Sequence, residues 1–250
     1  MSTSPLEPMV RTLSYRAVLD GDDREAILSL PCTVKMVERL HYLVRERDRA
    51  TQTCVMLSGY SVRSKLVGDG SRQIVAIHMK GDTVDLHNSL LGIADHSVQT
   101  LVSSKVGMIP RDEIVRIAEK RPQVGRAMWL ETLADASLTR EWVANIGRRD
   151  ARSRLAHLFC EFAVRMKVAG LADENQFELP MTQEQLADAT GLTSVHVNRT
   201  IRVMESEGLI RRLGRRAVAY DDWRKLAEVG DFDTNYLHLN TSEPALAWKG

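Results

Sequence analysis

Residues 194–207 carry side chains of the types and spacing that could contact the edges of DNA bases. Four of them fall at i, i+3, i+4 and i+7 and would share one helical face: Val195, Asn198, Arg199 and Arg202. Arginine can bond guanine O6 and N7 together, and valine can only offer apolar contact, for example to a thymine methyl. A different face is apolar: Val197, Ile201 and Met204. This pattern predicts a helix held by a core on one side and free to enter a major groove on the other.

Arginines are concentrated around this helix although the whole chain is almost neutral. The 250 residues contain 34 Lys+Arg against 33 Asp+Glu, a formal net charge of +1. Between residues 194 and 216, six arginines stand against two glutamates, a local excess of +4: Arg199, Arg202, Arg211, Arg212, Arg215 and Arg216. Such clustering indicates a contact face for a polyanion, while a solvated charged surface is the alternative.

The elements around this helix predict a winged helix-turn-helix. Thr182 and Gln185 form a capping box that begins one helix, Thr190-Gly191-Leu192 is a short turn, and Thr193 can cap the second helix. Gly208 closes that helix. Residues 209–220 then predict a hairpin with an arginine-bearing tip, which is the wing.

The first 110 residues predict an antiparallel β-barrel or jelly roll. Seven short runs are rich in β-forming residues and are separated by turn residues: 34–37, 41–44, 54–57, 60–67, 72–79, 98–102 and 105–109. Gly68-Asp69-Gly70 supplies the positive φ angles that a tight hairpin needs. Residues 1–24 carry little pattern, so the sequence leaves open whether this N-terminal segment is ordered.

From Arg111 to about Gly170 the pattern is helical. Pro122 is suited to the first turn of a long helix that runs to about Ile146 and is ended by Gly147, and a further helix follows over 148–169. Five residues of the long helix form a stripe that is either a core face or a dimer seam: Leu130, Leu133, Ser137, Arg140 and Ala144.

The segment TQEQLADATGLTSVHVNRTIRVMESEGLI resembles the helix-turn-helix signature of the Crp/Fnr superfamily of bacterial transcription regulators. RRDARSRLAHLFCEF, DDWRKLAEVGDFDTNYLHL and GSRQIVAIHMKGDTVDLHNSLL are also similar to family members, so the resemblance covers about residues 30 to 240. It implies an α+β chain with an antiparallel β-roll sensor domain, a long dimerisation helix and a C-terminal winged helix-turn-helix. The expected boundaries are an N-terminal segment 1–24, the sensor 25–121, the helix 122–147, the DNA-binding domain 148–240 and a tail 241–250.

The resemblance also implies the partners and the contact residues. Family members bind palindromic promoter DNA as homodimers and touch RNA polymerase. Arg199 matches the family's base-contacting arginine, whereas Val195 stands where many members have glutamate, so we expect a different half-site. The predicted DNA contacts are Thr182, Ser194, Val195, His196, Asn198, Arg199, Arg202, Arg215 and Arg216.

The sensor region departs from members that bind cyclic nucleotides. Those members carry a glutamate just after the Gly-Asp turn and an Arg-Ser-Ala further on. Here the corresponding residues are 81–87 and 96–98, and no arginine lies between Arg72 and Arg111. A buried phosphodiester without a guanidinium partner would lack its strongest hydrogen bonds, so the sequence argues against cyclic AMP. The iron–sulfur members carry a cluster of N-terminal cysteines, and this sequence begins without one, so we expect no control by an iron–sulfur cluster either.

Histidines and cysteines give no metal or catalytic motif by spacing. His78, His87 and His96 lie near several aspartates but lack close ligand spacing, so we predict no metal site and leave haem or another effector open. The cysteines, Cys32, Cys54 and Cys160, are an odd set and are predicted to be core residues, with redox activity left open. No nucleophile elbow, P-loop, HExxH or dinucleotide fingerprint occurs, so an enzyme is a remote alternative and no catalytic residue is predicted.

Composition limits the compartment. Apolar residues make up 44% and charged residues 27% of the chain, as in soluble globular proteins, and no apolar run approaches a membrane span. The N-terminus lacks the features of a secretory signal, so we expect a cytoplasmic protein without a membrane partner. The sequence predicts a homodimeric, sequence-specific DNA-binding regulator. A regulator gated by an unidentified small molecule or haem in the β-roll is the alternative.

Overall fold

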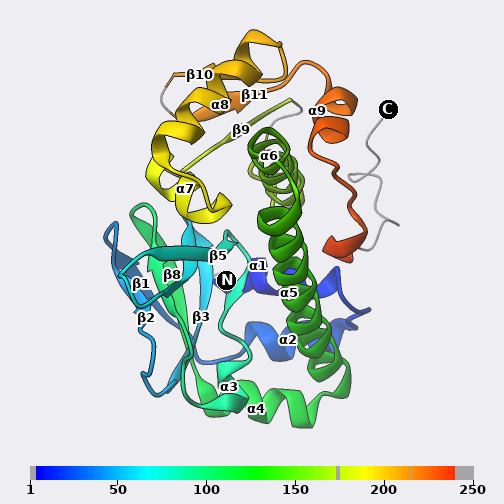
Figure 1. Cartoon of the computed structure of the whole chain (residues 1–250). Coiled ribbons are helices and arrows are strands. Elements are labelled where there is room, and N and C mark those ends of the chain that lie inside the picture. The colour runs from blue at the N-terminus through cyan, green and yellow to red at the C-terminus, as the bar shows by residue number, and fades with distance from the viewer. Residues whose placement is uncertain (1–3, 173–174, 215, 240–250) are drawn as a thin grey trace. The chain divides into compact units, whose positions relative to one another are not determined.

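The computed structural model describes residues 4–172, 175–214 and 216–239, which divide into two compact units. The first comprises Met1–Lys65 and Val75–Ala136, and the second comprises Leu66–Ile74 and Ser137–Gly250. The predicted α+β class is confirmed (Figure 1). Within the described ranges, none of the helices combines the length and the apolarity that crossing a bilayer would demand. The predicted tail 241–250 lies outside the described residues.

Two four-stranded sheets form the β-roll. One has the order β1 (Thr33–Val37), β8 (Ser104–Pro110), β3 (Gln52–Ser58), β6 (Thr83–Val84). The other has the order β2 (Tyr42–Val44), β7 (Ser97–Thr100), β4 (Ser61–Leu66), β5 (Arg72–His78). All the pairings with a defined register are antiparallel. The predicted strands are therefore confirmed within a few residues, and the two-residue strand β6 was missed.

Small and flexible apolar side chains fill part of the roll. One buried cluster contains side chains of β3, β6, β7 and β8: Cys54, Met56, Val84, Val98 and Val106. Strand residues alternate in direction, so these side chains come from one face of each strand.

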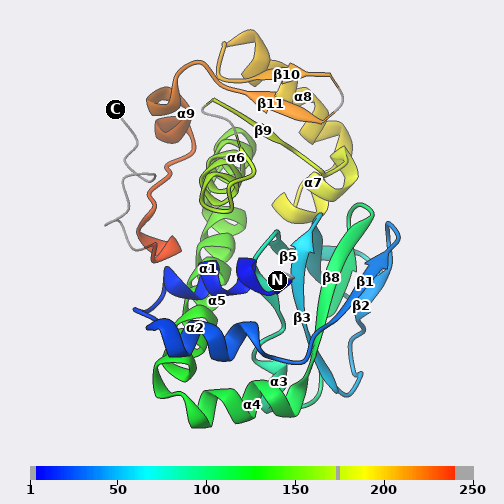
Figure 2. The same ribbon diagram turned by 180° about the vertical axis from the view of Figure 1, so that it is seen from behind.

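Residues 4–28, which carried little visible pattern, form two helices. They are α1 (Glu7–Ser14) and α2 (Gly21–Leu28), and they lie side by side in both views (Figures 1 and 2). The first is fixed by four fully buried residues at helical spacing: Leu6, Met9, Val10 and Leu13. The second begins at Asp20, whose side chain accepts a hydrogen bond from the Asp23 amide in a capping box. The N-terminal segment is thus an ordered part of the first unit from residue 4 onward.

Two shorter helices, α3 (Asn88–Leu91) and α4 (Arg111–Lys120), precede the long helix α5 (Pro122–Arg148). Pro122 begins α5 as predicted. Gly147 does not end it, because the helix continues through this residue to Arg148. A glycine without a positive φ can remain helical at a cost of about 1 kcal/mol. The break comes instead at Asp150, which caps the next helix through the amides of Arg152 and Ser153.

The second unit is built around helix α6 (Ala151–Val168). It also contains α5 from Ser137 onward, and its further described helices are α7 (Gln183–Thr190), α8 (Ser194–Ser206), α9 (Trp223–Val229) and the 3-10 turn η1 (Asn235–Leu237). Strands β9 (Gln176–Glu178), β10 (Arg211–Leu213) and β11 (Ala217–Ala219) form an antiparallel sheet in the order β10-β11-β9. Phe159 and Phe162 of α6 pack against Phe177 of β9, with ring centroids 6.3 and 5.8 Å apart. This core holds α7 and α8 in place.

Candidate nucleic-acid interface

Local hydrogen bonds fix the turn between α7 and α8. The Thr182 hydroxyl accepts from the Gln185 amide at 3.2 Å, and the Gln185 side chain accepts from the Thr182 amide at 2.9 Å. Gly191 ends α7 with a φ of +65°, in the left-handed region where glycine is favoured. Thr193 then caps α8 by accepting from the His196 amide at 3.2 Å. The predicted capping box, turn glycine and second cap are all confirmed.

The Thr193 cap gives a prediction for stability. Thr193→Ala removes the side-chain acceptor for the His196 amide, so we expect the free energy of unfolding to fall by about 0.5–2 kcal/mol. Urea denaturation followed by circular dichroism measures this change. Thr193→Ser keeps the hydroxyl and should stay close to wild type. An alanine variant as stable as the serine variant would contradict the role of the cap.

Helix α8 is divided between a buried and an exposed face. Val197, Ile201 and Met204 are at most 4% exposed, as the predicted core face requires. The opposite side carries the side chains selected from the sequence: Ser194, Val195, Arg199 and Arg202 are exposed, and His196 and Asn198 are half-buried. Val195 is 79% exposed. Core packing therefore gives no reason for an apolar side chain at this position.

A groove of about 600 Å³ runs along this exposed side. It is lined by Gln183, Ser194, Val195, Asn198, Arg199, Arg202, Val203 and Ser206. Gln183 was not among the residues predicted from the sequence, although it follows the predicted Thr182 in the first turn of α7. Its side-chain oxygen accepts a hydrogen bond from the side-chain Nδ2 of Asn198 at 2.9 Å. This bond fixes the orientation of Asn198, so part of its hydrogen-bonding capacity is already used within the protein.

The six arginines of residues 194–216 are not equivalent. Arg211 bonds both carboxylate oxygens of Asp221, and Arg212 bonds both oxygens of Glu205. These two guanidinium groups are therefore already paired with carboxylates. Arg199, Arg202 and Arg216 are exposed, and within the described ranges their side chains make no hydrogen bond or ion pair. Among the five arginines of this stretch that the structure describes, these three have charge available for phosphate or guanine.

The predicted wing forms as a short hairpin. Arg211 pairs with Ala219 and Leu213 with Ala217 across β10 and β11, and β9 extends the sheet on the other side. Arg216 is exposed beside the hairpin tip, as the prediction of a phosphate contact requires. Arg215, the other predicted wing contact, lies outside the described residues.

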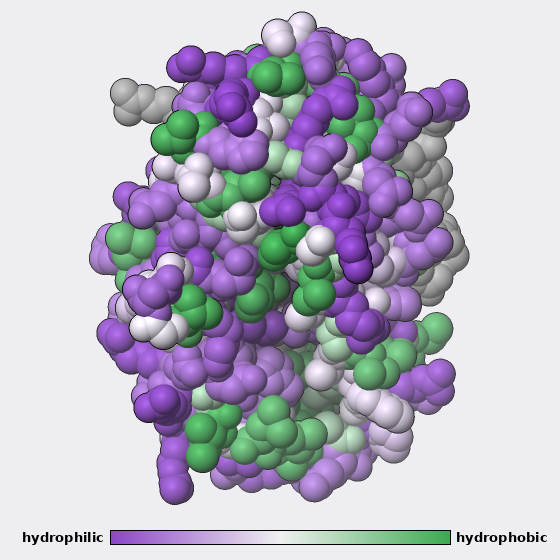
Figure 3. All heavy atoms as spheres, viewed as in Figure 1, coloured by the Kyte–Doolittle hydropathy of each residue, from purple (hydrophilic) through white to green (hydrophobic). Residues whose placement is uncertain are grey.

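The predicted dimer seam only partly matches the exposed side of α5. Leu133, Arg140 and Ala144 are exposed, Leu130 is half-buried and Ser137 is buried. The exposed side is centred on a neighbouring stripe with alternating spacings of three and four, formed by Trp129, Leu133, Ala136, Arg140, Val143 and Gly147. Trp129 and Val143 are each 68% exposed, although both are large and apolar. On the face drawn in Figure 3, hydrophobic residues form separate patches within a mainly hydrophilic surface.

The β-roll contains a buried guanidinium group that the sequence argument about cyclic nucleotides overlooked. Arg63 of β4 is 7% exposed, and its Nη1 lies 2.7 Å from Oδ2 of Asp135 in α5. Its Nη2 lies 3.6 Å from Oδ1 of Asp85. The absence of an arginine between Arg72 and Arg111 is therefore not a valid argument by itself. Arg63 already faces two carboxylates, and their charge would repel a phosphodiester.

The three cysteines give a prediction for thiol chemistry. Burial raises the pKa of Cys54 to about 12, and it also raises the pKa of Cys160 and of the half-buried Cys32. Since thiolates are the reactive form, we expect a disulfide reagent at pH 8 to modify at most one thiol in the folded chain and three in urea. Cys32→Ser should abolish the native reaction. Rapid native modification of Cys54 or Cys160 would overturn their assignment to the core.

Comparison with known proteins finds a family model that matches each half of the chain and solved structures with the same fold. Residues 34–121 match a cyclic nucleotide-binding domain, and residues 153–229 match a Crp-like helix-turn-helix domain. The solved structure of FixK2 from Bradyrhizobium japonicum shares the fold with a TM-score of 0.73 and 23% identity, covering 80% of this chain and 98% of that one. A CooA mutant from Carboxydothermus hydrogenoformans has a TM-score of 0.66 and 18% identity, covering 92% and 97%.

Curated relatives are similar over most of the chain. The transcriptional activator protein Anr of Pseudomonas aeruginosa is 23% identical over 225 residues, which cover 90% of each chain. The transcriptional activator protein FnrL of Cereibacter sphaeroides is 30% identical over 189 residues, which cover 74% of this chain and 75% of the relative. The helix-turn-helix geometry, the β-roll and this level of similarity together identify the chain as a member of the Crp/Fnr family of transcription regulators.

Proposed function

We propose that the chain is a homodimeric regulator that binds a palindromic DNA site by inserting α8 into the major groove. The observation that carries this proposal is the exposed face of α8, where Arg199 and Arg202 lie beside Val195 and their guanidinium groups make no hydrogen bond or ion pair with the described residues. Arginines that were buried in ion pairs, or a helix face that was entirely apolar, could not contact DNA in this way. Arg199 pairs with guanine, Val195 contacts an apolar group such as a thymine methyl, and Arg202 and Arg216 contact phosphates.

The exposed stripe of α5 supports the homodimer. Its spacing of three and four residues is that of a two-stranded helical seam, and Trp129, Leu133 and Val143 supply apolar area for it. A two-fold axis along this seam presents two copies of α8 to one DNA duplex. The half-sites then lie about one helical turn apart, ~34–36 Å between centres.

The relatives support a role in transcription rather than catalysis. FnrL and Anr bear the name of transcriptional activator, and residues 153–229 match a Crp-like helix-turn-helix domain. By extension, the DNA-bound dimer of this chain contacts RNA polymerase at its promoters. We assign no catalytic residue.

A second candidate is a regulator of the same build whose DNA binding depends on an effector in the β-roll. The observation that favours it is the set of buried polar side chains in that domain, which includes Arg63, Asp85 and His96, each at most 7% exposed. Burying charged groups costs free energy unless they are paired. Binding of an effector would account for such a cluster in the β-roll.

Selection of duplexes from a random pool tests the proposal. Purified chain without added ligand is mixed with the pool at physiological salt, and bound duplexes are sequenced over several rounds. A two-fold palindrome with a guanine in each half-site is the expected result. If the sequences of the bound duplexes stay random and the affinity depends only on the salt concentration, the chain does not bind a specific sequence without an effector. The effector-dependent candidate then takes its place.

A further inference from the structure

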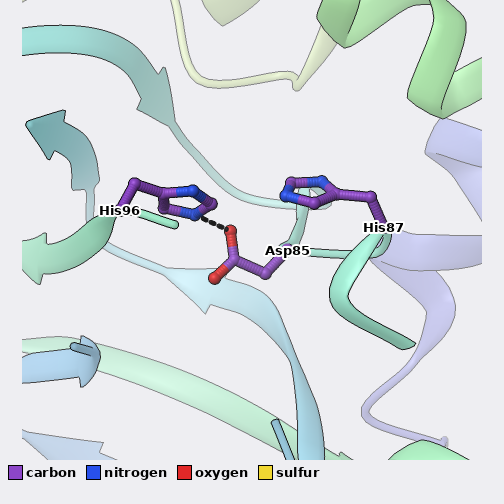
Figure 4. Close-up of side chains that lie close together, drawn as sticks. All are labelled: Asp85, His87 and His96. Atoms are coloured by element: carbon purple, nitrogen blue, oxygen red, sulfur yellow. Dashed lines mark hydrogen bonds and ion pairs between the residues drawn. The ribbon is translucent and has the colours of Figure 1, made fainter. Parts of the chain in front are cut away.

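Three potential metal ligands meet in the β-roll although they are separated in sequence. Asp85 follows strand β6, His87 precedes helix α3, and His96 directly precedes strand β7. One ligand atom from each residue lies within 4.8 Å of the other two. Figure 4 shows the Asp85 carboxylate between the two imidazole rings, whose centroids are 5.5 Å apart. Folding thus creates a compact donor set that the sequence spacing did not predict.

The Asp85 carboxylate is buried, and only one of its two oxygens has a hydrogen-bond partner among the described residues. Its side chain is 4% exposed, and Oδ1 lies 2.6 Å from Nε2 of His96. Oδ2 is buried and has no hydrogen-bond partner among the described residues. Arg63 cannot supply one, because its Nη2 is 3.6 Å from Oδ1 and its Nη1 is bound to Asp135. An unsatisfied oxygen of a buried carboxylate is costly, and the oxygen that faces the two rings is Oδ1.

Asp95 orients His96 from the outer side. Its Oδ1 lies 2.5 Å from Nδ1 of His96, and its side chain is 81% exposed. Carboxylates commonly hold a metal-binding histidine in this way, accepting from one ring nitrogen while the other binds the ion. With Nδ1 held by Asp95, Nε2 is directed at the cluster. The arrangement has both the ligand atoms and the supporting contact of a metal site.

We propose that Asp85, His87 and His96 bind one divalent transition-metal ion. Two imidazoles and one carboxylate suit Zn²⁺, Co²⁺ or Fe²⁺, whereas Mg²⁺ and Ca²⁺ prefer all-oxygen sites. Ligands 2.0–2.2 Å from a tetrahedral ion lie about 3.4 Å apart, so small side-chain movements complete the site. The ion displaces to solvent the proton shared by His96 and Asp85. Three protein ligands leave further coordination positions for water or a small molecule.

Metal binding by the full-length chain tests the site directly. The chain is stripped with chelator, and Zn²⁺ binding is measured by equilibrium dialysis, with the visible absorption of Co²⁺ reporting the ligand set. We expect one ion per chain. His87→Ala, His96→Ala and Asp85→Asn should each weaken Zn²⁺ binding by more than 100-fold. The matched control is His41→Ala, which removes an exposed histidine of the same unit and should leave binding unchanged.

Asp95→Ala keeps the proposal testable if the buried variants fail to fold. Its side chain is exposed, so the fold should survive, and loss of the supporting carboxylate should weaken Zn²⁺ binding by about 10–100-fold. The proposal is overturned if the wild-type chain binds no stoichiometric Zn²⁺ or Co²⁺, or if Asp95→Ala and His87→Ala bind as wild type does. No DNA is present in these measurements, so failure here leaves the proposed DNA-binding function untouched.

Discussion

Arg199→Ala is expected to abolish the preference of the chain for its selected palindrome over random duplex. Arg199 is exposed on the groove side of α8 and its side chain makes no hydrogen bond or ion pair within the described residues, so the guanidinium group is free to bond guanine O6 and N7. Such a bidentate contact is worth about 1–3 kcal/mol of discrimination in each half-site. A dimer uses the contact twice, so the expected loss of specificity is about 2–6 kcal/mol. Fluorescence anisotropy with both duplexes measures it.

Arg216→Ala is the matched control for this prediction. Arg216 is also exposed and lies beside the wing, where it faces phosphates rather than bases in the proposed complex. Its loss should weaken selected and random duplexes alike and reduce the slope of log affinity against log salt, by about 1 for each phosphate contact removed. If Arg199→Ala behaves as Arg216→Ala does, α8 does not contact the bases.

Leu133→Asp is expected to convert the chain to a monomer and weaken binding to the palindrome by about 10²–10⁴-fold. Leu133 is 48% exposed within the α5 stripe, where a carboxylate in a closed seam would be buried opposite its own copy. The two half-sites would then be bound by separate molecules. Analytical ultracentrifugation gives the mass, and anisotropy gives the affinity.

The control for the dimer prediction is Val18→Asp, which places the same charge at an apolar position that is 85% exposed outside α5. This variant should keep the mass and affinity of the wild type. A Leu133→Asp chain that is still dimeric, with its DNA affinity unchanged, would show that the seam lies elsewhere on the molecule.

The helix-turn-helix could be predicted from sequence almost residue by residue because its signals are local. Thr182 with Gln185, Gly191 and Thr193 act over three or four residues, and each has the predicted role. α1 was missed for a different reason. Its apolar residues from Leu6 to Leu13 have helical spacing, but the helix is short and needs the rest of the unit for its core.

The remaining differences depend on contacts between distant residues. The stripe from Leu130 to Ala144 has the periodicity of a seam, yet periodicity alone does not say which side of α5 packs against its own chain. Ser137 is buried there, while Trp129 is exposed. The meeting of Asp85, His87 and His96 depends on how β6 and β7 are placed in the roll. No spacing rule for helices or short loops could have predicted it.

Methylation protection of guanine N7 on the selected duplex tests the central claim most directly, because N7 lies in the major groove and is the atom that Arg199 is assigned to bond. The wild-type dimer should protect one guanine in each half-site, with the two positions about one helical turn apart on the same face of the DNA. Arg199→Ala should lose this protection at protein concentrations that still saturate the duplex. Guanines that stay fully reactive under the saturated wild-type protein would contradict the placement of α8 in the major groove.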